Sequence, residues 1–247
     1  MAKKKESKQT KSKVEKSKDK KVRGKKIGSK SSIAQMEKQV KIVVGVMIAI
    51  LILIAIAFLM SKSMNITKYA GLKFEKVKYG EIYIYAAKVP IIENHQIVDW
   101  IYVNLRNNPK KTAEEVKVNL STGINLPYGS NLVYISIDSE TEKCEDAGIA
   151  IINLGSVFFK NIGLNTKIAS YNKSFAELRG HPYISCSSAS KDAGVFKIQP
   201  SNKDITQIRE IVPYCYVLEY KDCDDLVKLT ERLQLAIIEQ YMNGLEP

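Results

Sequence analysis

The sequence is poor in the residues that metal and redox sites need. It has two histidines, His95 and His181, and four cysteines, and none of the cysteines are in C-x2-C spacing. Zinc sites and dithiol redox sites depend on such pairs or on nearby histidines. Gly-rich phosphate loops, H-E-x-x-H, EF-hand loops and a nucleophile elbow around the serines at 185–190 are missing as well. We therefore expect no catalytic residue, metal or cofactor, and favour a protein that is not an enzyme.

Residues 1–41 lack aromatic side chains and hold few apolar ones. They carry fifteen lysines and one arginine against four acids, a net charge of +12, whereas residues 42–247 have equal numbers of basic and acidic side chains. Such a segment cannot bury enough apolar surface to fold, so we expect a disordered, Lys-rich cytoplasmic tail. Three roles stay open for the tail: contact with anionic lipid, non-specific contact with nucleic acid, or a topology signal alone. No specific nucleic acid is expected as a partner.

One long apolar run follows the tail. Ile42 to Met60 is nineteen residues without a charge, about 28 Å of helix, which matches the hydrocarbon core of a bilayer. A cleaved signal peptide has a shorter run of about 7–15 residues, although Ala55–Ala57 resembles a cleavage site. We expect a single transmembrane signal anchor over 42–60 in the cell membrane. The positive-inside rule then places the tail in the cytoplasm and the C-terminal domain outside.

All four cysteines lie beyond the apolar run. An even number in the part expected outside indicates disulfides formed in an oxidising compartment. Cys144 and Cys223 each occupy the first helical turn after a strand, and Cys186 and Cys215 lie inside strands that can be neighbours. A Cys215–Cys223 bond would have to close across a strand of about 17 Å. We predict the pairs Cys144–Cys223 and Cys186–Cys215. Three sequons are candidate glycosylation sites: Asn65, Asn119 and Asn172.

The remaining sequence predicts an extracytoplasmic α/β (α+β) domain over 71–247, after a tether over 61–70. Alternating apolar residues and a turn at Gly80 indicate an N-terminal antiparallel meander over roughly 72–106. A short helix should follow, with Asn108 as its N-cap and a proline at its first position.

From residue 131 the pattern changes to βαβ units. Ser139 and Glu142 form a capping box, which predicts a long crossover helix that ends at Gly163 between two parallel strands. The following segments read as further strands: 182–186, 194–200, 205–211 and 214–220. A stripe of leucines, Ile237 and Tyr241 indicates a final helix over 222–243.

Acidic side chains gather where two predicted strands end. Asp138 and Glu140 follow one strand, and Asp222 and Asp224 follow another. Since α/β sheets bind ligands at the carboxyl ends of their strands, these acids are a candidate site for a cation or a polar ligand. Acids at these places also cap helices and offset the helix dipole, as would Asp225. We favour capping, and keep the ligand site, which would support a membrane-tethered enzyme, as the alternative.

Four stretches carry a resemblance: LRNNPKK, LVYISIDSE, PYISCSS and YCYVLEYKDCDDLVKLTERL. In these stretches the chain resembles a group of uncharacterised single-pass membrane proteins of small-genome archaea, over most of 70–247 and in the order that the group shows. The resemblance implies the compartment and the fold. It also places Cys186 and Cys215 at a recurrent cysteine pair, with Cys144 and Cys223 as an addition. It implies no activity, so we expect an outer domain that binds an envelope protein or another envelope component.

Overall fold

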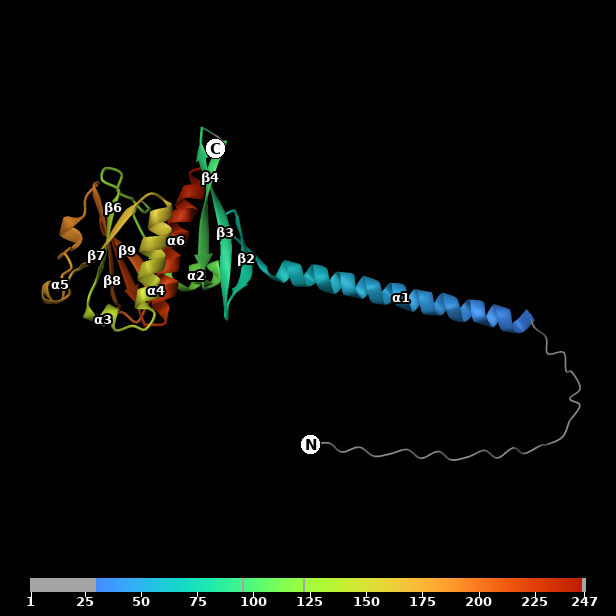
Figure 1. Ribbon diagram of the computed structural model, residues 1–247. Coiled ribbons are helices and arrows are strands. Elements are labelled where there is room, and N and C mark those ends of the chain that lie inside the picture. The colour runs from blue at the N-terminus through green and yellow to red at the C-terminus, as the bar shows by residue number, and fades with distance from the viewer. Residues whose placement is uncertain (1–29, 95, 122, 246–247) are drawn as a thin grey trace, which may run out of the picture. The chain divides into compact units, whose positions relative to one another are not determined.

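The computed structural model describes residues 30–94, 96–121 and 123–245, drawn in colour in Figure 1. Most of the predicted tail, up to residue 29, lies outside the described residues. The chain divides into two units, Met1–Ile56 and Ala57–Pro247, and we describe each by itself. Helix α1 (Lys30–Met64) contains the segment Met36–Leu59, which is long and apolar enough to cross a membrane. The helix begins before the predicted span, because residues 30–41 are helical as well.

The first sheet is the predicted meander with one additional strand. Its antiparallel order is β1 (Ile66–Tyr69), β2 (Leu72–Tyr79), β3 (Ile82–Glu93) and β4 (Gln96–Leu105). Strand β1 lies in the segment predicted as a tether, which was wrong for these four residues. Ala70 and Gly71 both have positive φ, 48° and 72°, as the tightest hairpin turn requires.

The second sheet is mixed, with the order β5-β9-β10-β8-β6-β7. The strands are β5 (Lys117–Asn119), β6 (Leu132–Ile137), β7 (Asn165–Ser170), β8 (Ala193–Pro200), β9 (Gln207–Val212) and β10 (Cys215–Tyr220). Strands β10, β8, β6 and β7 run parallel to one another, so the predicted βαβ unit of β6 and β7 is confirmed. Strand β9 pairs antiparallel with β10 and parallel with β5, which was not predicted.

The crossover between β6 and β7 is three helical pieces rather than one helix. They are α3 (Ser139–Glu142), α4 (Ala147–Ile152) and a π-helix, η1 (Asn153–Phe159). The predicted capping box was wrong, because the N-cap is Asp138, whose side chain accepts from the Thr141 amide. Gly155 lets the π-helix approach the sheet, since a Cβ there would lie 2.9 Å from Thr166 Cγ2 and 3.1 Å from Ile135 Cδ1.

Two other segments depart from the expectation. Residues 182–186, predicted as a strand, form one bridge at Tyr183 and then a 3-10 turn, η2 (Cys186–Ser188). Helix α5 (Lys173–Arg179) was not predicted, although Asn172 caps it and Gly180 ends it with φ +67°. Helix α2 (Pro109–Glu115) has the predicted N-cap, Asn108.

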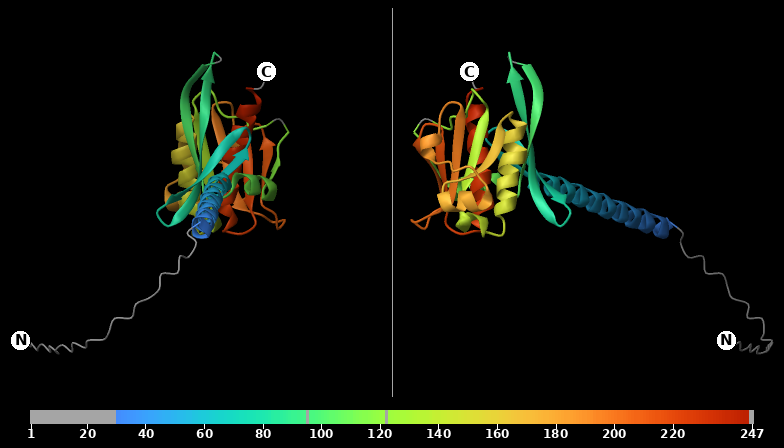
Figure 2. Two further views of the ribbon diagram at one scale, coloured as in Figure 1. Left: turned by 90° about the vertical axis from the view of Figure 1, so that its right-hand side faces the viewer. Right: turned by 60° about the vertical axis from the view of Figure 1, so that its left-hand side comes forward.

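Helix α6 (Asp225–Asn243) lies between the two sheets together with α4, as Figures 1 and 2 show. Its residues are buried without interruption from Leu229 to Ile238, because each face packs on a different sheet. The core joins Phe74 and Leu105 of the first sheet to Phe196 of the second. Helix α5 lies on the side of the second sheet away from α6. The domain is therefore layered as sheet, helices, sheet and a single short helix.

Candidate functional site

The cysteines form two disulfides, in the pairs expected from the sequence. Cys144 of the crossover is bonded to Cys223 in the turn before α6, with their Cα atoms 5.3 Å apart. Cys186 of the 3-10 turn is bonded to Cys215 at the start of β10, with a Cα separation of 5.4 Å. The first bond joins the crossover to the turn that follows β10, and the second joins the 3-10 turn to the start of β10. The described part of the chain has no free thiol, so its cysteines offer no nucleophile.

The first pair of strand-end acids is occupied by local contacts. The Asp138 carboxylate accepts from the Thr141 amide and from the Thr141 hydroxyl, both at 3.0 Å. Burial, and next a hydrogen bond to Asp138, raise the pKa of the Tyr171 phenol. Glu140 pairs with Lys143 at 2.7 Å. Asp138 therefore serves as a cap and an acceptor, in line with the capping interpretation.

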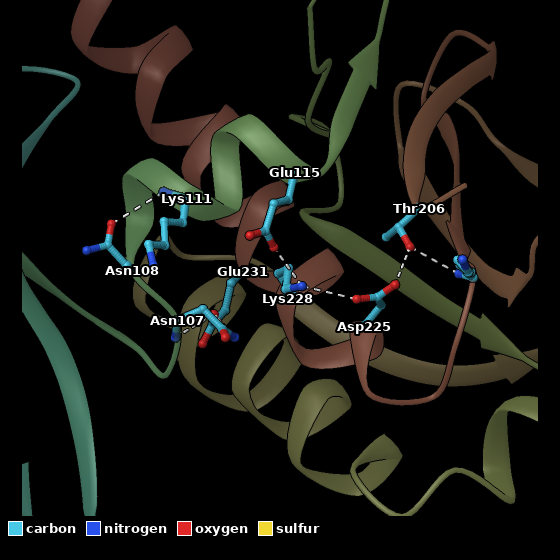
Figure 3. A network of polar contacts seen from close by, with 9 residues as sticks. Asn107, Asn108, Lys111, Glu115, Thr206, Asp225, Lys228 and Glu231 are labelled. Carbon is cyan, nitrogen blue, oxygen red and sulfur yellow. Dashed lines mark hydrogen bonds and ion pairs between the residues drawn. The ribbon is translucent and has the colours of Figure 1, made fainter. Parts of the chain in front are cut away.

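The second pair of acids, Asp222 and Asp224, lies exposed in the turn before α6. Asp224 occupies the N-cap position but makes no capping hydrogen bond, so capping was wrong for this residue. Its neighbour Asp225 accepts from the Thr206 hydroxyl at 2.7 Å and from Lys228 at 3.1 Å (Figure 3). Burial acts to raise the pKa of Asp225, but these two hydrogen bonds and the charges of Lys228 and Lys221 together outweigh it, so the pKa is lowered.

Lys228 extends this network to Glu115 of α2, at 2.8 Å, and so joins α2 to the start of α6 (Figure 3). Among the described residues, no group of three or more His, Cys, Asp or Glu side chains is arranged to hold a metal ion. Asp138, Glu140 and Asp225 thus make local structural contacts, whereas the side chains of Asp222 and Asp224 lie exposed. Of the sequon asparagines, Asn65 and Asn119 are exposed, and the Asn172 side chain is engaged in capping α5.

The polar face of the second sheet has a cluster that the sequence did not reveal. Lys197 of β8 lies with its Nζ 4.0 Å from the centre of the Tyr171 ring. Burial lowers the pKa of Lys197, and the charges of Asp138 and Glu219 oppose this shift. The cation is thus held by an aromatic face and by carboxylates that are themselves engaged.

Glu219 of β10 is the most fully paired carboxylate of that face. It accepts from Arg209 Nε at 3.0 Å and Nη2 at 2.6 Å, from Gln207 at 2.6 Å and from Gln199 at 3.2 Å. The Arg209 hydrogen bond is the main cause of its lowered pKa, against the effect of burial. Four donors satisfy both carboxylate oxygens, so Glu219 stabilises the strand packing and has little capacity left for a substrate.

An apolar hollow lies elsewhere in the described domain, between the first sheet and the C-terminal end of α6. It has a volume of about 890 Å³, within the usual range for ligand pockets. Its walls come from β3, β4, the segment 124–128, the end of the crossover and α6. The apolar walls include Val89, Ile91, Ile101, Ile124, Leu126, Phe158, Ile162, Ile237 and Ile238.

Polar groups fix the walls of this apolar cavity. The Gln240 side chain accepts from the Ile124 amide at 2.6 Å and donates to the Ile124 carbonyl at 3.1 Å. The Tyr241 hydroxyl accepts from the Ile92 amide at 2.9 Å. Tyr128, 70% exposed, lies at the rim. The apolar stripe predicted for the last helix includes Ile237 and Tyr241, which line this cavity. The other walls come from segments more than 100 residues away in the sequence, so a local pattern could not predict the cavity.

No family model, curated protein or solved structure matches the chain. The candidate site therefore stands on its geometry: an apolar cavity with fixed walls, separate from the strand-end acids.

Proposed function

We propose that the chain is a single-pass membrane protein whose C-terminal domain lies outside the membrane and binds an apolar segment of another envelope component. Helix α1 supports the anchor, because its apolar segment is long enough to span a bilayer. Sixteen basic residues precede the apolar run, which supports a cytoplasmic N-terminus and leaves contact with anionic lipid as a further role for the tail. Two disulfides support an oxidising compartment for the domain.

The chemistry of the cavity walls carries the proposal of binding rather than catalysis. The described lining residues include no charged side chain, histidine, cysteine or serine. Of the groups that serve nucleophilic and general acid–base catalysis, these lining residues offer only tyrosines, and the Tyr241 hydroxyl already accepts from the Ile92 amide. An open apolar cavity instead gains free energy by removing an apolar partner from water. Of the acids that would serve a tethered enzyme, Asp138 is engaged in capping and hydrogen bonds, and Asp222 and Asp224 lie exposed, away from the cavity lining.

Photocrosslinking in intact envelopes tests this proposal. A photoreactive residue in place of Tyr128, at the cavity rim, should form one defined adduct, identified by mass spectrometry. The matched control replaces Tyr183, another exposed tyrosine, which forms a bridge to Ser170 at the β7 edge of the second sheet. Ile91→Trp, which fills the cavity, should abolish the Tyr128 adduct. Equal adducts at both tyrosines, or an adduct that survives Ile91→Trp, would contradict binding in the cavity.

A further inference from the structure

The first sheet has one face on the core and one face turned away from it, which we call the outer face. Residues of the core, such as Phe74, Val89 and Val103, are even-numbered in β2 and odd-numbered in β3 and β4. Because side chains alternate along a strand, the outer face holds the odd positions of β2, the even positions of β1 and β3, and the even positions of β4 from Trp100 onward, after the bulge in that strand. Lys88 and Tyr102 are directly paired in the sheet, and the Lys88 Nζ lies 5.2 Å from the centre of the Tyr102 ring. This contact is expected when both side chains lie on the outer face.

The outer face is unusually apolar for a surface that no other described element covers. Its exposed members include Val77, Tyr79, Ile82, Trp100 and Tyr102. An antiparallel sheet with one solvated face normally carries polar side chains there. A contiguous exposed apolar surface instead marks a contact with a protein or a membrane.

The connection to α1 limits what can reach this face. Only seven residue steps separate Leu59, the end of the apolar segment, from Ile66, the start of β1. Even a fully extended chain spans at most about 25 Å over that distance. Strand β3, with twelve residues, is itself about 40 Å long. This connection is shorter than the first sheet is long. If α1 spans the bilayer, the start of the first sheet therefore stays close to the membrane surface.

The chemistry of the face fits the bilayer interface. Trp and Tyr are enriched at the level of lipid headgroups, where their rings are buried and their polar atoms stay hydrated. The outer face combines Trp100 with Tyr79 and Tyr102. It also carries Lys68, Lys73 and Lys88 against a single carboxylate, that of Glu75, as the strand registers show. A net positive, aromatic and apolar surface complements anionic headgroups above acyl chains.

We propose that the outer face of the first sheet docks on the surface of an anionic bilayer, with Trp100 and its neighbouring tyrosines in the interface and the lysines at the phosphates. This docking rests on the proposed membrane anchor, because α1 brings the sheet to the lipid. It orients the domain so that the outer face meets the membrane.

Trp100 is the only tryptophan of the chain, so its fluorescence reports on this face directly. The full-length protein is reconstituted in phosphatidylglycerol vesicles with brominated or unbrominated acyl chains. Docking predicts a loss of Trp100 emission in the brominated vesicles and poor access for iodide. The control is Trp100→Phe with Tyr183→Trp, which moves the reporter to the β7 edge of the second sheet. That emission should be the same in both kinds of vesicle.

Two matched valines test whether the face itself makes the contact. Val77 lies on the outer face and Val212 at the end of β9, and both are 42% exposed in strands. Val77→Glu should reduce the quenching of Trp100 by brominated lipid, since it places a carboxylate against anionic headgroups. Val212→Glu should leave the quenching unchanged. Equal effects of the two variants would overturn the proposal.

Separate outcomes distinguish this proposal from the membrane anchor. Alkaline extraction of the same vesicles tests the anchor alone, because an integral protein stays with the lipid. If the protein is retained and Trp100 is unquenched by brominated lipid but open to iodide, the outer face faces water and docking is wrong. If Trp100 is shielded from both quenchers, a protein surface such as a second copy covers the face, and docking on lipid is again wrong.

Discussion

Glu231 in the middle of α6 makes the stability of the domain depend on pH. Its side chain is fully buried. One carboxylate oxygen accepts from the Arg106 amide. The other accepts from the Asn107 amide at 3.1 Å and from Asn107 Nδ2 at 2.8 Å; Figure 3 shows Asn107 beside Glu231. Burial raises the pKa of Glu231 from 4.5 to about 7, and the hydrogen bonds from Arg106 and Asn107 partly oppose the shift.

The sign of the effect follows from proton binding. Between pH 4.5 and about 7, the folded state holds a proton on Glu231 that the unfolded state has lost, so the free energy of unfolding falls as pH rises. The contribution is fully present below the unfolded pKa and is lost as pH rises through the folded pKa. A shift of this size corresponds to about 3 kcal/mol. The lowered pKa values of Glu219 and Asp225 act at lower pH, outside this window.

Urea unfolding of the detergent-solubilised chain, followed by far-ultraviolet circular dichroism at pH 5 and pH 8, measures this difference. The wild type should lose up to about 3 kcal/mol between the two values, and Glu231→Gln should remove that loss. The Gln variant is also expected to be less stable at both values by about 1–3 kcal/mol, because its amide faces the donors of Asn107. Glu145→Gln, at an exposed position, should retain the wild-type slope. Parallel slopes for the wild type and Glu231→Gln would refute the reasoning.

Two further predictions concern stability, measured by the same urea unfolding. Replacing Cys144 and Cys223 by serine should cost about 4.5 kcal/mol for a loop of 79 residues, and replacing Cys186 and Cys215 about 3.6 kcal/mol for a loop of 29 residues; a larger loss for the second pair would count against chain entropy as the cause. Gly155→Ala should cost about 1–3 kcal/mol, because its Cβ would meet Thr166 and Ile135. Gly148→Ala, with open space around it, should instead gain up to about 1 kcal/mol of helix propensity, and equal effects would contradict the close packing at Gly155.

The strands were predictable where local alternation and turn residues agree. Gly80 and the alternating residues around it marked the hairpin of β2 and β3, which the structure has. Helix α5 was missed although its cap residues are present, because seven residues give too little periodicity to be distinguished from a loop. The apolar run of the crossover predicted one helix, but its first part is broken at Cys144, where a disulfide to a residue 79 positions away decides the local geometry.

The candidate site depends on contacts that no local pattern carries. The acids at strand ends were visible as a cluster in the sequence, whereas the partners that occupy them, Tyr171 and Thr206, come from other segments. The cavity walls are likewise assembled by α6, whose burial on both sides requires two sheets. A sequence stripe shows one apolar face of such a helix, and the second face appears only when the first sheet is in place.

The central claim is that α1 crosses a membrane and leaves the disulfide-bonded domain outside. Epitope tags at the two ends of the full chain test it most directly, by antibody binding to intact and permeabilised cells. The account predicts that the C-terminal tag is accessible in intact cells and that the N-terminal tag is accessible only after permeabilisation. Accessibility of the N-terminal tag in intact cells, with the C-terminal tag protected, would contradict it.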